Sequence, residues 1–318
     1  MEVIERPRAP TLWVRLALPY DLPLPDGPYV CRNAANSWTV HIKRVDLAPS
    51  AGRTHDMSFR MDGTLGDATG VDLPGAPTRY THATIQLSFT LEGTSLPAEQ
   101  ERRLLSAAHE CLNYFLDWYR LTTGDVEVRP LSLLEFYAIR SRQALSPRWW
   151  IPDGAGGGTD AGGADFGPFG AVLGAPQMVE PAAVDVVRRR LECGDPPRLW
   201  KLLLLNARSY VRTGETRQCV IDANTALDIL VEEVAEQLLG RDGLASEAIE
   251  KTLKNKRTVL ALEEIIAPRC REPLPLPEFR EIRKLRNAAV HDGYSPSSEE
   301  ADKTTDVLAR VATIIDNL

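Results

Sequence analysis

The sequence predicts an α+β protein in which a β-rich N-terminal domain precedes an all-α helical bundle. Short runs of β-branched and aromatic residues, separated by Pro, Gly and Asp, fill the first 90 or so residues. After residue 176 apolar side chains instead recur every three or four positions, which is typical of amphipathic helices. The chain has 318 residues, enough for two hydrophobic cores.

The N-terminal domain is expected to span residues 1–152. We expect strands within residues 12–20, 38–47 and 83–93. A helix should begin near Ser95 and Pro97 and end near Gly124, because leucine and aromatic residues between them follow helical spacing. The segment 126–139 is expected to add one short strand and a helical turn. Nothing in this domain indicates its function beyond a sensor or regulatory role.

A Gly-rich segment at residues 153–175 separates the two patterns and is expected to be a linker or a mobile loop. It does not end in the G-K-[ST] of a phosphate-binding loop, so nucleotide binding there is disfavoured.

Residues 176–318 are expected to form a helical domain. Six segments have helical spacing, and glycines at 214, 240 and 293 are expected to end three of the helices. Ser297 and Glu300 have the S-x-x-E spacing of a capping box before the last helix. The segments are residues 179–194, 197–214, 215–239, 245–266, 277–293 and 297–318.

Composition limits the classes of function. The net charge of −7 disfavours general nucleic-acid binding, so any such binding must use a local basic patch. Five cysteines are dispersed without a C-x-x-C or a Cys/His cluster, so we expect no metal site and no cofactor. The N-terminus lacks the apolar stretch of a signal peptide, and no apolar run approaches the roughly 20 residues of a membrane span. We therefore expect a cytoplasmic protein without a membrane segment.

The chemistry-bearing residues gather in the segment 277–293. Arg286 falls within the apolar stripe of that helix, where a guanidinium is costly to desolvate unless it meets a carboxylate or a phosphate. Asn224 and Asp228, in the middle of the long helix 215–239, are the expected supporting partners of Arg286. Asn287 and His291 are four residues apart and therefore share a face near the helix end.

These residues resemble the signature of the HEPN superfamily (higher eukaryote and prokaryote nucleotide-binding domain), over roughly residues 198–318. The resemblance consists of the helix NARSYVRTG, the T-A-L-D within the long helix, and L-R-N-A-A-V-H-D-G before a final amphipathic helix. The family's Arg, polar residue, three variable residues and His correspond to Arg286, Asn287 and His291. The family commonly has Glu where this chain has Asp228.

The resemblance implies a homodimer, formed through the helical domain, with two motifs facing one cleft. It implies a metal-independent endoribonuclease whose RNA substrate is cut by attack of its own 2′-hydroxyl, leaving a 2′,3′-cyclic phosphate. Arg286 would stabilise charge on the phosphate, His291 would move a proton, and Asn287 would bind the phosphate or orient His291. The implied setting is prokaryotic antiviral defence, abortive infection or a toxin system, with a regulatory partner protein or ligand at the N-terminal domain.

Two alternatives stay open. The same helices suit a catalytically silent dimerisation module that binds a nucleotide or a protein, in which Arg286 pairs with Asp228 and His291 caps its helix. The basic residues Lys254, Lys256 and Arg257 could follow an RNA backbone or form a solvated helix face.

Overall fold

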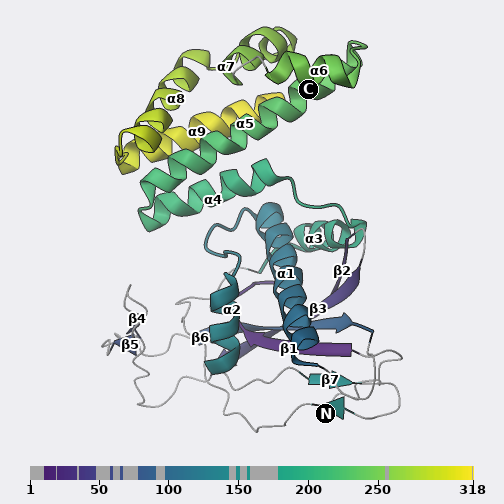
Figure 1. The fold of residues 1–318 in the computed structure, drawn as a ribbon. Helices are drawn as coiled ribbons and strands as arrows, with labels where there is room; N and C mark the ends of the chain where they lie inside the picture. Colours follow the sequence, from purple (N-terminus) through teal and green to yellow (C-terminus); the bar gives the residue numbers. More distant parts are fainter. Residues whose placement is uncertain are drawn as a thin grey trace. The chain divides into compact units, whose positions relative to one another are not determined.

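The computed structural model describes residues 11–18, 20–33, 36–47, 58–59, 65–66, 78–90, 97–142, 148–150, 156–157, 178–254, 258–316 and 318 (Figure 1). The chain forms two compact units. The first contains residues 1–123 and 128–196, and the second contains residues 124–127 and 197–318. The first unit has a sheet and helices and the second is helical, so the α+β class is confirmed.

The main sheet of the first unit is antiparallel throughout and has the order β2-β3-β6-β1-β7-β8. Its four long strands include the three expected from the sequence and one unexpected strand, β2. The strands are β1 (Thr11–Ala17), β2 (Gly27–Arg32), β3 (Ser37–Leu47), β6 (Thr78–Ser88), β7 (Arg148–Trp150) and β8 (Gly156–Gly157), and a separate pair is formed by β4 (Ser58–Phe59) and β5 (Leu65–Gly66).

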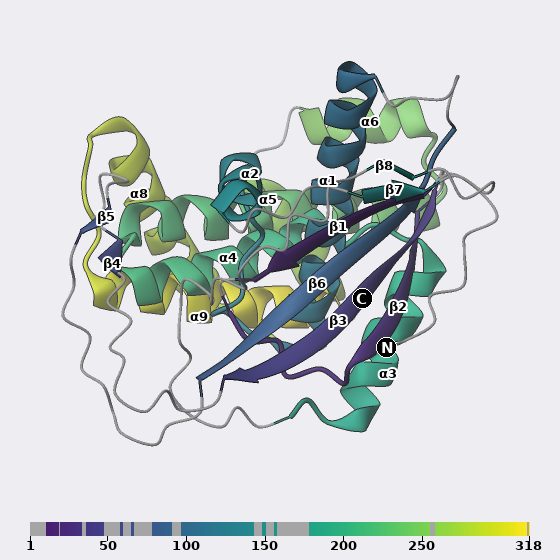
Figure 2. The same cartoon turned by 90° about the horizontal axis from the view of Figure 1, so that it is seen from below.

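One face of this sheet carries the core of the first unit. Val14 on β1, Val40 on β3 and Ile85 on β6 are almost fully buried on that face, and alternate residues point away from it. The helices α1 (Ala98–Thr123), α2 (Leu133–Arg142) and α3 (Pro181–Cys193) contact the strands. The three helices lie behind the four long strands in Figure 2, which looks onto the opposite face.

The segment 126–131 is not the strand that we expected. Asn113 of α1 holds it instead, accepting from the backbone N–H of Leu131 at 2.9 Å and donating to the carbonyl of Leu131 at 2.8 Å. His109 Nε2 lies 2.6 Å from the same carbonyl. These side chains take the place of a neighbouring strand, so the apolar residues of the segment become buried without joining the sheet.

The helix α3 belongs to the first unit, which moves the boundary that the sequence indicated. Val187 and Leu191 are completely buried in the same cluster as the sheet residues. The compact helical unit therefore begins at Pro197 and not at residue 176. Of the expected linker, only Gly156–Gly157 is described, and these residues pair with β7.

The second unit packs its helices around α5 (Thr216–Arg241), which has twelve buried residues. The helix α9 (Ser298–Ile315) and α4 (Leu199–Thr213) lie along it in Figure 1, and contacts join all three pairs. The remaining helices are α6 (Ser246–Lys254), α7 (Thr258–Ala261), a π-helical turn (Leu262–Ile266), a 3-10 turn (Ala267–Arg269) and α8 (Leu276–His291).

The expected helix ends are confirmed with one exception. Gly214 follows α4 with a φ of 78°, and Gly293 follows α8 with a φ of 70°. Residues other than glycine rarely adopt this left-handed backbone conformation, because their Cβ atom clashes with the backbone. Ser297 and Glu300 form the expected capping box. Gly240 lies inside α5 and does not end it. No helix in the described ranges is long and apolar enough to cross a membrane.

A second capping box generates a pH prediction. Ser132 precedes α2, and the Glu135 carboxylate accepts from the backbone N–H and the hydroxyl of Ser132, both at 2.8 Å, and from Arg129. Although partial burial raises the pKa of Glu135, the bonds from Arg129 and Ser132 outweigh it and lower this pKa to about 2. Because the pKa in the folded state lies below the usual value, the stabilisation is present above about pH 4.5 and is lost between about pH 4.5 and 2.

We therefore expect Glu135→Gln to lower the free energy of unfolding by about 1 kcal/mol at pH 7, a figure reduced for the side chain's partial exposure. The difference should shrink towards zero as the pH falls to about 2. Urea unfolding across this pH range measures it. Glu99→Gln is the matched control because Glu99 is exposed and pairs with Arg103 on the same helix. If the wild type and Glu135→Gln differed in unfolding free energy by the same amount at every pH, the stabilisation could not come from the ionised Glu135 carboxylate.

Candidate functional site

The packing of α8 against α5 positions the candidate site. Phe279, Ile282 and Ala289 of α8 are buried, as the spacing predicted, and α8 contacts α5 along its length. The helix ends at His291, two residues before Gly293, which has a left-handed backbone with φ of 70°. Arg286, Asn287 and His291, which we call the α8 motif, thus occupy the last two turns of the helix.

The strongest polar contact between the two helices joins Asp228 of α5 to Arg283 of α8. Arg283 Nη1 lies 2.8 and 2.9 Å from the two carboxylate oxygens of Asp228. The two side chains are 22% and 33% exposed, so solvent screens the pair only in part. The expected pairing of Asp228 with Arg286 is therefore wrong: Arg286 lies almost one turn further along α8 than the arginine that Asp228 holds.

Asn224 does not support Arg286 either. Its side chain is completely buried, and Nδ2 donates to the carbonyl of Val220 within α5 at 2.9 Å. Its Oδ1 atom is buried without a hydrogen-bond partner in the part of the chain that the structure describes. An unpaired buried acceptor is destabilising, so the Asn224 side chain lowers the stability of the helical unit.

Arg286 is half-buried and incompletely bonded. Nη1 donates to Oδ1 of the exposed Asn287 at 3.3 Å, a long bond between neighbouring residues. Among the described residues, no acceptor lies within hydrogen-bond distance of the buried Nε atom. The guanidinium thus remains in the apolar stripe of α8, as the sequence indicated, without the carboxylate partner that we expected.

His291 is exposed at the end of α8, and no hydrogen bond to its ring is present within the described ranges. The backbone beside it is held from α5: Arg217 Nε donates to the carbonyl of Ala289 at 2.9 Å, and Thr216 Oγ1 donates to the carbonyl of Pro296 at 2.6 Å. These two residues fix both sides of the turn that follows His291.

Arg217 is the residue that the sequence reasoning missed. A basic residue in the first turn of a helix opposes the helix macrodipole, and this unusual position was the available signal. The hydrogen bond to Ala289 uses only the Nε atom of Arg217. It holds the exposed guanidinium group close to the end of α8. Arg217 is thus a cation of α5 that lies beside the last turn of α8.

The other candidate residues lie elsewhere or outside the description. Lys254 is exposed at the end of α6. Lys256 and Arg257 lie outside the described residues, and a role of the three in RNA binding stays a prediction. In the described ranges, no group of three or more His, Cys, Asp or Glu side chains has the arrangement of a metal site.

Two acids near the site have shifted pKa values. Partial burial raises the pKa of Asp222 on α5, opposed by a 2.5 Å hydrogen bond from Gln218. The backbone N–H of Ser297 donates to Glu300 at 2.7 Å and lowers the pKa of Glu300. Neither carboxylate bonds to the α8 motif, so both shifts belong to local helix structure.

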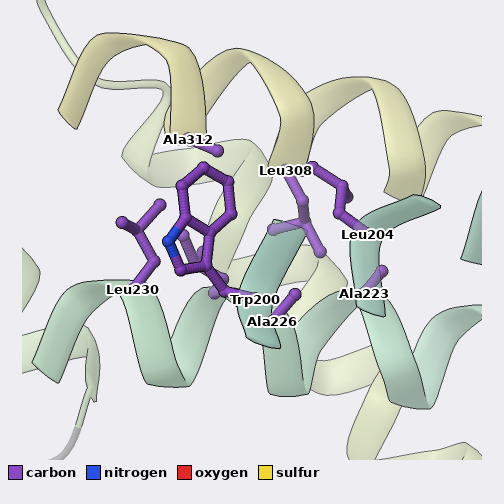
Figure 3. Close-up of a pocket in the computed structure, with 8 residues that line it drawn as sticks. Trp200, Leu204, Ala223, Ala226, Leu230, Leu308 and Ala312 are labelled. Atoms are coloured by element: carbon purple, nitrogen blue, oxygen red, sulfur yellow. The ribbon is translucent and has the colours of Figure 1, made fainter. Parts of the chain in front are cut away.

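The α8 motif lines neither of two hollows in the described part of the helical unit. The first is a crevice beside Trp200, too narrow for a water molecule, whose remaining lining is Leu204, Ala223, Ala226, Leu227, Leu230, Leu308 and Ala312 (Figure 3). The second, of about 410 Å³, lies between the segment before α8 and the end of α9, with Arg269 and Arg271 in its lining. Asn287 and His291 are exposed and Arg286 is half-buried, so the α8 motif lies at the surface of a single chain.

Comparison with known proteins finds no family model, no curated protein and no solved structure that matches this chain.

The unpaired Nε atom predicts that Arg286 lowers the stability of the fold. Arg286→Met keeps an unbranched side chain in the apolar stripe and removes the buried donor, so we expect the free energy of unfolding to rise by about 1 kcal/mol. Chemical denaturation of both proteins measures this difference. Arg280→Met is the control because Arg280 is exposed and bonded to Glu263 at 2.9 Å, so its loss should bring no gain. A destabilised Arg286→Met variant would show that the guanidinium has a partner in the folded protein.

Proposed function

We propose that residues 197–318 form a HEPN-like domain and that the protein is a metal-independent endoribonuclease. The RNA's own 2′-hydroxyl attacks the adjacent phosphate, the bond to the 5′-oxygen of the next nucleotide breaks, and a 2′,3′-cyclic phosphate remains. The observation that carries the proposal is the half-buried guanidinium of Arg286, whose Nε has no acceptor in the described structure.

A phosphate would satisfy that guanidinium. Leaving a buried donor unpaired costs about 1 to 3 kcal/mol, and an anionic oxygen recovers this cost on binding. Arg286 is permanently charged and can stabilise the negative charge that develops on the phosphate during attack. Asn287 is exposed beside it and presents a second polar group to the same ligand.

His291 supplies the proton transfer that the reaction requires. Histidine changes its charge near neutral pH, and this ring is exposed on the last residue of α8. One His291 takes the proton from the 2′-hydroxyl or gives a proton to the departing 5′-oxygen. The bond from Arg217 to Ala289 restrains the backbone that presents this ring.

The proposed active form is a homodimer. Arg286 and His291 point about 140° apart around the axis of α8, because each residue turns the helix by about 100°. A phosphate bound to Arg286 of one chain therefore approaches His291 of the other chain most directly. The first unit is proposed to regulate the nuclease in a setting such as prokaryotic antiviral defence or a toxin system.

A catalytically silent binding module is the second candidate, and two observations favour it. No described side chain orients the His291 ring, and Asp228 is already held by Arg283. Such a module would dimerise through the helical domain and bind a nucleotide or protein without cutting RNA.

We expect the purified protein to cleave single-stranded RNA or transfer RNA in the presence of EDTA, leaving cyclic-phosphate ends. His291→Ala should reduce the rate about a hundredfold or more, because general acid–base catalysis contributes at least that much. Arg286→Ala should lose a comparable factor through lost charge stabilisation. Gel analysis of end-labelled RNA and mass spectrometry of the products measure both.

Arg280→Ala is the matched control, because it removes an arginine from the same helix that is bonded to Glu263. Its rate should equal that of the wild type. Dimerisation of every variant is measured by sedimentation. Intact dimers that leave all RNA uncut would overturn the nuclease proposal in favour of the binding module.

A further inference from the structure

The sheet of the first unit has a second face that no helix of the described residues covers (Figure 2). Its described outward positions include one cross-strand row that runs through all four long strands: Val30 on β2, Thr39 on β3, Gln86 on β6 and Trp13 on β1 are register partners in that order. A neighbouring row contains Pro28, His41 and Thr84. We call these two rows, together with Arg32 and Lys43, the open face.

An ordered aromatic pair lies at the centre of the open face. The rings of Trp13 and His41 are stacked across β6, with centroids 5.7 Å apart and planes inclined by 27°. His41 Nε2 lies 3.2 Å from Oε1 of Gln86, which fixes the imidazole ring on the sheet. The pair therefore presents a preformed stacking surface whose side-chain entropy is already reduced.

The charge of the open face differs from that of the whole chain. The protein has 44 acidic and 37 basic residues, yet the described outward positions of β1, β2, β3 and β6 include no Asp or Glu. Arg32 and Lys43 are exposed there, each one row beyond the two rows and on opposite sides of them along the strands. A negatively charged backbone running along the strands would meet a cation on either side of the aromatic pair.

The hydrogen-bonding side chains complete the surface. Thr39 on β3 and Thr84 and Gln86 on β6 are half-buried beside the rings, so each can present a donor or acceptor to the edge of a base. Along β3, the row that contains Arg32 and the row that contains Lys43 are six residues apart, about 20 Å at about 3.3 Å per residue. This length accommodates two or three unstacked nucleotides.

We propose that the open face binds single-stranded nucleic acid. Bases stack on the ring pair of Trp13 and His41, the polar side chains of β3 and β6 contact the base edges, and Arg32 and Lys43 bind phosphates. A duplex is excluded because its bases are already stacked on one another. This site lies in the first unit, and it does not depend on the nuclease proposed for the second.

The test measures, by fluorescence anisotropy, the binding of a fluorescently labelled oligouridylate of about ten nucleotides to the full-length His291→Ala protein. The His291→Ala background keeps the RNA intact, so binding is measured whether or not the wild type is a nuclease. Oligothymidylate of equal length distinguishes DNA from RNA. A duplex of the same length should bind at least about tenfold more weakly.

Trp13→Ala should raise the dissociation constant about tenfold or more, whereas Trp13→Phe, which keeps an aromatic ring, should stay close to the parent. Lys43→Glu tests the phosphate contact at an exposed position where misfolding is no concern, and it should weaken binding and reduce its dependence on salt. Arg102→Glu is the matched control, because Arg102 is exposed on α1, which packs on the other face of the sheet.

Tight single-strand binding that Trp13→Ala and Lys43→Glu both weaken, with Arg102→Glu unchanged, would establish the site. The proposal is overturned if the parent protein binds neither oligonucleotide. It is also overturned if Lys43→Glu and a folded Trp13→Ala variant bind as well as the parent, and a protein partner is then the remaining candidate for the open face.

Discussion

The contact between α5 and α8 is the constraint on which the candidate site depends. It combines a buried apolar seam, to which Phe279 and Ala289 contribute, with the Asp228–Arg283 ion pair and the bond from Arg217 to the end of α8. The seam sets which face of α8 is buried, and the polar contacts set how far α8 lies along α5. Together they hold the last turns of α8, which carry Asn287 and His291, at a fixed position on the surface.

This packing gives Arg286 its unusual position. The axial offset that aligns Arg283 with Asp228 leaves Arg286 without a carboxylate, so a charged group remains half-buried with one donor unpaired. Such an arrangement lowers stability unless a ligand or second chain provides the missing acceptor. The proposed phosphate contact satisfies this group, and the proposed dimer brings His291 of the second chain to the same phosphate. The site is therefore incomplete in one isolated chain.

The two units differ in where their candidate binding residues lie. In the helical unit the exposed Asn287 and His291 lie in the last two turns of α8, where the proposed site would bind a single phosphate. In the first unit, α1, α2 and α3 lie on one face of the sheet, and Trp13, His41 and Gln86 are spread over the other. A broad, rigid surface of this kind suits recognition of several groups at once. The proposed nuclease site and the proposed nucleic-acid surface thus belong to different units of the chain.

The sequence by itself determined the elements whose signals are local. Helical spacing predicted α5, α8 and α9, Ser297 and Glu300 predicted their capping box, and the stripe of α8 predicted the partial burial of Arg286. Tertiary structure decided everything that depends on which surfaces meet. In the tertiary structure α3 packs against the sheet and β2 pairs with β3. The segment 126–131 forms no strand, and its backbone is bound by Asn113. The tertiary structure also pairs Asp228 with Arg283, because the offset between two helices follows from their packing, which periodicity within one helix does not encode.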